Sequence, residues 1–214
     1  MKVLVFCLYK RIYPASRESI HRIKWERPLD YLFLYGEPGE KRGPSIAAGQ
    51  RQGQRIFLNG DWDAALFVES DMIYPADALG KLAALNADIA YGLYCSRWRY
   101  KWLLTIGEER GQPRGYLSDN TRRAMRDAGR VIDVTGKGTG ITLIRREVMA
   151  QVEFHARNHH FSDHWLAAQA IQYGWRQKAD LSVLCGHIVH TDYEDDTRGV
   201  VWPTATPPFY TIAR

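Results

Sequence analysis

Apolar runs alternate with longer amphipathic stretches over the first 95 residues, and this alternation is typical of strand–helix–strand units. A continuous apolar run favours a strand that is buried on both faces, as in parallel sheets. Four such strands are predicted, at residues 3–8, 30–35, 64–68 and 89–94. Three helices are predicted between them, at residues 15–23, 46–58 and 76–85. We therefore expect an α/β, Rossmann-like domain with a mixed, mainly parallel sheet.

The regular pattern stops at residues 95–129, which are rich in aromatic and basic side chains and are broken by glycine and proline. This composition predicts a long functional loop with a short helix at residues 121–128. Further strands are predicted at residues 131–134, 140–144 and 182–185, with a helix at residues 160–173. The chain then becomes acidic and proline-rich. We expect one domain over residues 1–190 and an extended tail over residues 191–214.

The composition fits a single water-soluble globular domain, because 45% of the 214 residues are hydrophobic and 25% are charged. No apolar run approaches the about 20 residues that a membrane-spanning helix needs, so we expect a cytoplasmic protein with no membrane partner. The three cysteines, Cys7, Cys95 and Cys185, are widely spaced and odd in number. This argues against a disulfide framework and against a cysteine-rich zinc site.

The net charge of +5 is unevenly distributed. Residues 97–146 hold 12 Lys or Arg against 5 Asp or Glu, a local charge of +7, whereas the rest of the chain is slightly acidic. A basic region of this kind indicates an anionic partner, such as a diphosphate, a nucleic acid or a membrane surface. Arginines on a solvated surface are the simpler interpretation, and both remain open.

Two carboxylates stand at the end of one predicted strand, in the run Ala64-Ala65-Leu66-Phe67-Val68-Glu69-Ser70-Asp71-Met72. In open α/β sheets, ligands bind beyond the carboxyl ends of the strands. Carboxylates at that position can hold a hard divalent cation, which in turn can bridge the oxygens of a diphosphate. An acid-x-acid triplet is common by chance. What makes Glu69 and Asp71 candidate ligands is their position at the end of the predicted strand.

The run LFVESDMIYPADAL resembles the carboxylate motif of glycosyltransferases with the A-type (GT-A) fold, in the branch of small family-2-like enzymes. Four further segments resemble that family in the same order: VLVFCLYKR, YLFLYGEPG, GKGTGITLIRREVM and FSDHWLAAQAIQYGWRQKADLSVLCGHI. Together they cover most of residues 2–188. This sequence departs from the family pattern at Glu69, where an aspartate is usual, and at Ser162-Asp163, where an acidic pair is common.

The resemblance implies a nucleotide-sugar-binding domain that uses Mn²⁺ or Mg²⁺. Asp71 and His187 would bind the metal ion, and Glu69 would contact the donor ribose or a metal-bound water. Asp163 would be the general base that takes the proton from the attacking hydroxyl. Two simpler roles stay open: a buried histidine that is satisfied by the backbone for His187, and a helix N-cap for Asp163.

Donor and acceptor contacts are expected from other parts of the chain. Tyr9 can stack on the donor base, Glu37 can accept hydrogen bonds from the base or the ribose, and Arg51 can face the phosphates. A solvent-facing turn for Glu37 and an exposed helix face for Arg51 are the alternatives. On the acceptor side, the aromatic and basic run of the long loop can stack on bases or sugars. Its candidate residues are Arg97, Trp98, Arg99 and Lys101.

The expected reaction is transfer of a sugar from a nucleotide sugar, first of all a UDP-sugar, to a hydroxyl group. DNA that carries hydroxymethylated pyrimidines is the first acceptor considered, because the basic loop suits an anionic acceptor and small enzymes of phage origin act on such bases. A glycan, a lipid-linked sugar and a protein side chain are the rival acceptors. The oligomeric state stays open.

Three functions of other kinds compete with this interpretation. A non-catalytic nucleic-acid-binding module would leave the carboxylates structural. A dinucleotide-dependent oxidoreductase is disfavoured, since no GxGxxG follows the first strand. A zinc site is conceivable at a group of four spaced histidines, but no HExxH glutamate accompanies it. These histidines are His155, His159, His160 and His164.

Overall fold

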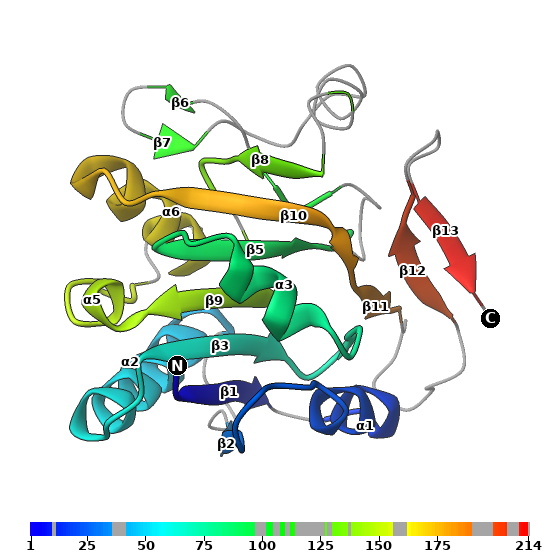
Figure 1. Cartoon of the computed structure of the whole chain (residues 1–214), viewed down its shortest axis with the longest axis horizontal. Coiled ribbons are helices and arrows are strands. Elements are labelled where there is room, and N and C mark those ends of the chain that lie inside the picture. The colour runs from blue at the N-terminus through cyan, green and yellow to red at the C-terminus, as the bar shows by residue number, and fades with distance from the viewer. Residues whose placement is uncertain are drawn as a thin grey trace.

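The computed structural model describes residues 1–9, 12–35, 42–96, 102–104, 108–109, 112–113, 127, 130–136, 138–155, 162–189, 199–204 and 210–213. Its main feature is a seven-stranded sheet in the order β2-β1-β3-β9-β5-β10-β8 (Figure 1). In chain order, these strands are β1 (Val3–Tyr9), β2 (Asp30–Tyr35), β3 (Ala64–Glu69), β5 (Ile89–Leu93), β8 (Val131–Asp133), β9 (Ile141–Arg145) and β10 (Gln177–Leu184).

The direction of the strands brings most carboxyl ends to one edge of the sheet. The β1–β2, β1–β3 and β5–β10 pairs are parallel, whereas β9 is antiparallel to both β3 and β5, and β8 is antiparallel to β10. Strands β1, β2, β3, β5 and β10 therefore share one direction. The predicted α/β fold with a mixed, mainly parallel sheet is confirmed.

Helices cover both faces of the sheet (Figure 1). The core on one face combines strand residues with α2 (Arg42–Asn59), α5 (Arg146–Met149) and α6 (Ser162–Tyr173). The core on the other face includes residues of α1 (Pro14–His21) and α3 (Ala78–Ala84). Along β1 the side chains alternate between the two cores, with Leu4 and Phe6 in the first and Val3, Val5 and Cys7 in the second. Alternation with apolar residues on both sides explains why this strand is a continuous apolar run in the sequence.

Two glycines let α2 pack directly against β1. Glycine within a helix lowers helix propensity, which makes this helix less certain from sequence alone. In the structure, a Cβ on Gly49 would collide with the side chain of Leu8, and a Cβ on Gly53 would lie 2.6 Å from the Phe6 ring. The glycines are therefore needed for close helix–strand contact, and packing compensates for their low propensity.

A smaller sheet stands at the carboxyl edge of the large one. It has the order β13-β12-β11-β4, formed by β4 (Met72–Ile73), β11 (Gly186–Ile188), β12 (Val200–Pro203) and β13 (Tyr210–Ala213). Figure 1 shows β12 and β13, the C-terminal strands, side by side at this edge. A separate two-stranded ribbon joins β6 (Glu108–Glu109) to β7 (Gln112–Pro113). In the described part of the tail, β12 thus pairs with the strand that carries His187, and β13 pairs with β12.

Most predicted elements match the structure, and the exceptions have identifiable causes. The strand expected at residues 182–185 is β10 and begins at Gln177, because buried polar residues interrupt its apolar pattern: Gln177 pairs with Tyr91 and Asp180 pairs with Arg130. The last helix is α6, described from Ser162 onward. Most of the short helix predicted at residues 121–128 lies outside the described residues.

Within the described residues, no helix is long and apolar enough to cross a membrane. The three cysteines are free and buried. Burial, together with the charges of Glu69 and Asp71, raises the pKa of Cys7 to about 12, so its thiol stays protonated.

Candidate metal centre

Pairing of two short strands brings together the two distant segments of the chain that carry the candidate ligands. Glu69 is the last residue of β3, and Asp71 comes immediately before β4. Strand β4 pairs antiparallel with β11, so that Met72 lies opposite His187. The Ile188 amide donates a 2.8 Å hydrogen bond to the Asp71 carbonyl. Residues more than 110 positions apart in the chain are therefore fixed next to each other by backbone geometry.

Glu69, Asp71 and His187 form the one group of potential metal ligands found among the described residues. Each offers a ligand atom, and these atoms lie within 4.8 Å of one another. The Nε2 atom of His187 is 3.5 Å from Oδ2 of Asp71, and His187 is 6% exposed. Nδ1 of His187 lies 2.8 Å from the Cys95 carbonyl and donates to it, because a carbonyl can only accept. In the neutral ring, Nε2 then presents its lone pair toward the carboxylates.

The electrostatics of this group favour a cation. Burial alone lowers the pKa of His187, but the hydrogen bond and charge of Asp71, the charge of Glu69 and the Cys95 carbonyl outweigh it and raise the pKa. Two carboxylates next to a buried ring therefore attract positive charge, which a proton or a metal ion can supply. Two oxygen donors and one imidazole fit Mn²⁺, whereas Mg²⁺ more commonly takes oxygen ligands alone.

Two buried tyrosines hold the end of β3 against the start of β9. The Tyr74 hydroxyl accepts a 2.7 Å hydrogen bond from the Glu69 amide and can donate to the carbonyl of Glu69 (2.8 Å) or of Gly140 (2.9 Å). The Tyr94 hydroxyl accepts a 3.0 Å bond from the Gly140 amide, and the Tyr94 ring lies edge-on to His187 at 6.0 Å. A Cβ on Gly140 would lie 2.6 Å from the Tyr94 ring, so only glycine allows this approach. These tyrosines set the backbone from which Glu69 extends.

Asp163, the predicted general base, lies in the first turn of α6, where a carboxylate is stabilised by the helix dipole. Its Oδ1 accepts a 2.8 Å hydrogen bond from the His164 amide. Burial first, then the charges of Glu69 and Asp163, raise the pKa of Tyr94. Asp163 and Glu69 therefore act electrostatically on the same buried side chain.

The other predicted contact residues divide into two groups. Tyr9 ends β1, half-buried, with its ring 5.7 Å from that of Tyr35 at the end of β2 in an edge-on arrangement. Arg51 donates a 2.7 Å hydrogen bond from Nη1 to the Phe154 carbonyl. The remaining predicted residues lie outside the described residues: Glu37, Arg97, Trp98, Arg99 and Lys101.

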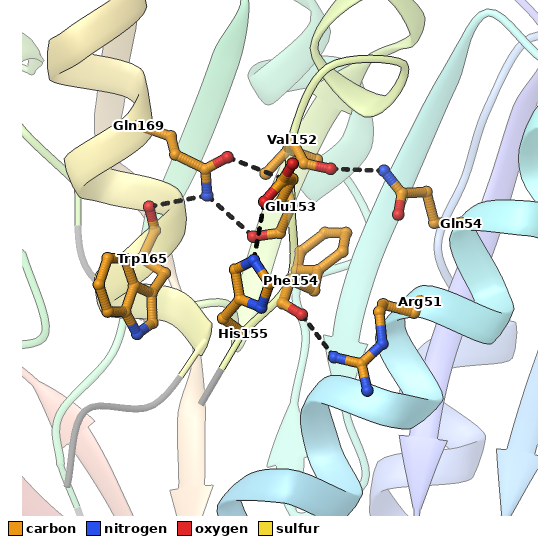
Figure 2. Close-up of polar contacts among 8 residues, drawn as sticks. All are labelled: Arg51, Gln54, Val152, Glu153, Phe154, His155, Trp165 and Gln169. Carbon is orange, nitrogen blue, oxygen red and sulfur yellow. Dashed lines mark hydrogen bonds and ion pairs between the residues drawn. The ribbon is translucent and has the colours of Figure 1, made fainter. Parts of the chain in front are cut away.

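Arg51 belongs to a set of polar side chains on α2 and α6 that form hydrogen bonds to the backbone around residues 152–155 from both sides (Figure 2). From α2, Gln54 donates to the carbonyls of Met149 and Val152, both at 2.7 Å. From α6, Gln169 accepts from the Glu153 amide (2.8 Å) and donates to the Glu153 carbonyl (2.9 Å). We call this arrangement the α2–α6 clasp. It holds the backbone of residues 152–154 between the two helices.

The histidine group proposed as an alternative zinc site is not supported by the described residues. His155 pairs with Glu153 at 2.8 Å and lies edge-on to Trp165 at 6.4 Å, beside the clasp. Neither His155 nor His164 belongs to the ligand group around His187. His159 and His160 lie outside the described residues.

The sequence interpretation missed the supporting residues Tyr74, Tyr94, Gln54 and Gln169. Glutamine and arginine at positions 50, 51 and 54 form a polar stripe along α2 with i, i+4 spacing, a signal that could have indicated a contact with backbone. The tyrosines carry no such signal, because a tyrosine in or beside an apolar strand also fits an ordinary core position.

Comparisons with known proteins identify the fold and leave the activity open. No family model matches the chain, and no curated protein is similar to it in sequence. Among solved structures, the protein A197 from STIV is similar over 100% of this chain and 95% of its own, with a TM-score of 0.65 and 16% sequence identity. Identity this low supports a common fold, and a fold by itself does not determine an activity.

Proposed function

We propose that this protein is a metal-dependent glycosyltransferase of the GT-A type, which transfers a sugar from a nucleotide sugar, UDP-sugar foremost, to a hydroxyl group. The observation that carries the proposal is the convergence of Glu69, Asp71 and His187 at the carboxyl edge of the sheet. Ligands of open α/β sheets bind at that edge. The order of the segments that resemble the family, from residue 2 to residue 188, is a second support.

The described residues suggest a division of roles. Asp71 and His187 would hold Mn²⁺, and the bound ion would neutralise the charge of the departing nucleoside diphosphate. Tyr9 and Tyr35, at the ends of β1 and β2, offer aromatic surface to the donor base. Asp163, whose charge reaches the same tyrosine as that of Glu69, would accept the proton of the attacking hydroxyl. Tyr9, Tyr35 and Glu69 end their strands at the carboxyl edge of the sheet, and Asp163 lies in the first turn of α6.

A screen of nucleotide sugars for Mn²⁺-dependent release of the nucleoside diphosphate tests this function. We expect release with one donor, with UDP-sugars tried first, and no release after Asp71→Ala. His155→Ala is the matched control, since its side chain contacts Glu153 outside the ligand group, and it should keep wild-type activity. Release that persists in Asp71→Ala and is lost in His155→Ala would contradict the assignment and favour the histidine group.

For the acceptor, we propose DNA that carries hydroxymethylated pyrimidines, on the basis of the +7 charge of residues 97–146. A hydroxymethyl group supplies the nucleophilic hydroxyl that an ordinary base lacks. Labelled sugar should enter hydroxymethylcytosine-containing DNA and leave unmodified DNA unlabelled. Binding to duplex DNA should also weaken steeply with salt, because Lys and Arg contacts release counterions from phosphates. Salt-insensitive binding without incorporation would assign the acceptor to the glycan, lipid-linked or protein class. Salt-sensitive DNA binding without any sugar release would favour a nucleic-acid-binding module instead.

A further inference from the structure

His187 sits on an inner strand of the small sheet and is held from both sides. On one side β11 pairs with β4, which follows Asp71 directly. On the other side it pairs with β12 from the C-terminal tail, where His187 lies opposite Val201. The Val189 amide extends this contact with a 2.9 Å hydrogen bond to the Gly199 carbonyl. Without β12, β11 would become an edge strand held only by β4.

Side chains of β12 also pack against the rest of the structure around β11. Val201 is fully buried and belongs to the larger core. Val200 and the indole of Trp202 together cover the backbone of Gly186, the residue before His187: a Cβ there would collide with the Val200 side chain and would lie 2.7 Å from two ring carbons of Trp202. Trp202 is thus packed against the peptide that sets the direction of the His187 side chain. It makes no contribution of its own to the ligand group.

We infer that the C-terminal strand pair β12–β13 holds His187 in its metal-binding position, with Trp202 as the positioning residue, and that metal binding and the order of these strands are coupled. The inference rests on the proposed metal centre. A ligand on a strand that can shift loses affinity, because the ion needs the ring nitrogen at a fixed place relative to Asp71. Coupling is reciprocal, so a bound ion must in turn stabilise β12.

Calorimetric titration with Mn²⁺ alone tests the positioning role. We expect Trp202→Ala to weaken Mn²⁺ binding by roughly 10-fold or more, the scale known for residues that orient a metal ligand. Trp202→Phe should recover most of the loss, because an aromatic ring again covers Gly186. The matched control is Trp62→Ala, which removes an indole packed on Phe57 and bonded to Asp30. It should lower stability and leave the Mn²⁺ affinity within about twofold, since a structural loss elsewhere does not move His187.

Hydrogen exchange of the unmodified chain tests the coupling without any change to β12. Mn²⁺ should slow amide exchange in the peptide that contains residues 200–203, and this protection should be absent in Asp71→Ala. Mn²⁺ affinity that is equal in wild type and Trp202→Ala, with unprotected β12 amides, would overturn the inference and leave the metal centre standing. Wild-type protein that binds no Mn²⁺, either alone or with UDP, would overturn both.

Discussion

At the scale of single residues, the structure separates groups that serve the candidate site from groups that serve the fold. Asp71 and Asp180 are both shielded acids, yet their surroundings differ. Asp71 lies with Glu69 and His187 in the group of potential metal ligands. Asp180, 1% exposed, accepts three hydrogen bonds from Arg130 and one from the Ser182 amide. Asp180 is held by an ion pair that stabilises the fold, whereas Asp71 stands where its oxygens and the His187 ring could share a cation.

Asp180 should make the stability of the protein depend on pH in the acid range. Burial raises the pKa of Asp180, but the bonds from Arg130 and from Ser182 outweigh it, and the pKa lies below the ordinary value of 3.8. A lowered pKa in the folded state contributes stability that is fully present above 3.8 and is lost as the pH falls through the lowered value. Asp180→Asn should therefore cost about 1.5–3 kcal/mol of unfolding free energy at pH 7.

Urea unfolding at a series of pH values measures this effect. The difference between wild type and Asp180→Asn should begin to shrink below pH 3.8, where the carboxyl of the unfolded chain gains its proton, and should vanish below the lowered pKa of the folded chain. Asp133→Asn, an exposed acid on the neighbouring strand β8, serves as the control and should change stability little. A difference that stays constant down to strongly acid pH would contradict the role given to the ion pair.

In the proposed reaction, Asp163 is the general base. Asp163→Asn should leave donor binding nearly intact and slow sugar transfer by roughly 10²-fold or more, because the amide keeps the shape but cannot accept a proton. Glu147→Gln, an exposed acid in the first turn of α5, is the matched control and should transfer at the wild-type rate. Transfer by Asp163→Asn at the wild-type rate would reduce Asp163 to a helix-end residue. Loss of donor binding as well would show that Asp163 has a structural role or is a metal ligand.

At the scale of elements, the sequence predicted regular apolar segments well and polar contacts poorly. Strands β1, β2, β3 and β5 were predicted within a residue or two, because burial on both faces leaves continuous apolar runs. Strand β10 was predicted to begin five residues too late, because its buried polar residues are satisfied by partners that are distant in the sequence. Nothing local marks those partners. For the same reason the α2–α6 clasp could not be predicted.

The clasp should contribute measurably to stability. Gln169→Ala removes both hydrogen bonds to the Glu153 peptide and should cost about 1–2 kcal/mol of unfolding free energy. Gln151→Ala, an exposed glutamine on the same connection, is the control and should be near neutral. Chemical denaturation of both variants gives the comparison. Equal stability of the two variants would show that α6 is held by its apolar face alone.

At the scale of the whole molecule, the candidate site is assembled from three distant parts of the chain. The end of β3 and the strand after β10 meet through β4 at the edge where five of the seven strands end, and the first turn of α6 carries Asp163. The sequence predicted Asp71 and His187 together through the family resemblance, and the structure brings them within 3.5 Å. It could not predict the place of the tail, because pairing of β12 with β11 depends on contacts formed only in the folded chain. Acceptor contacts at residues 97–101 stay a prediction.

The central claim is a metal-bridged nucleotide site, and thermal unfolding with Mn²⁺ and UDP tests it most directly. The ion needs phosphate oxygens to complete its coordination, so each ligand should strengthen the binding of the other. We predict that Mn²⁺ and UDP together raise the melting temperature by more than the sum of their separate shifts, and that Asp71→Ala abolishes this excess. Shifts that are merely additive, or no shift with either ligand, would contradict the claim.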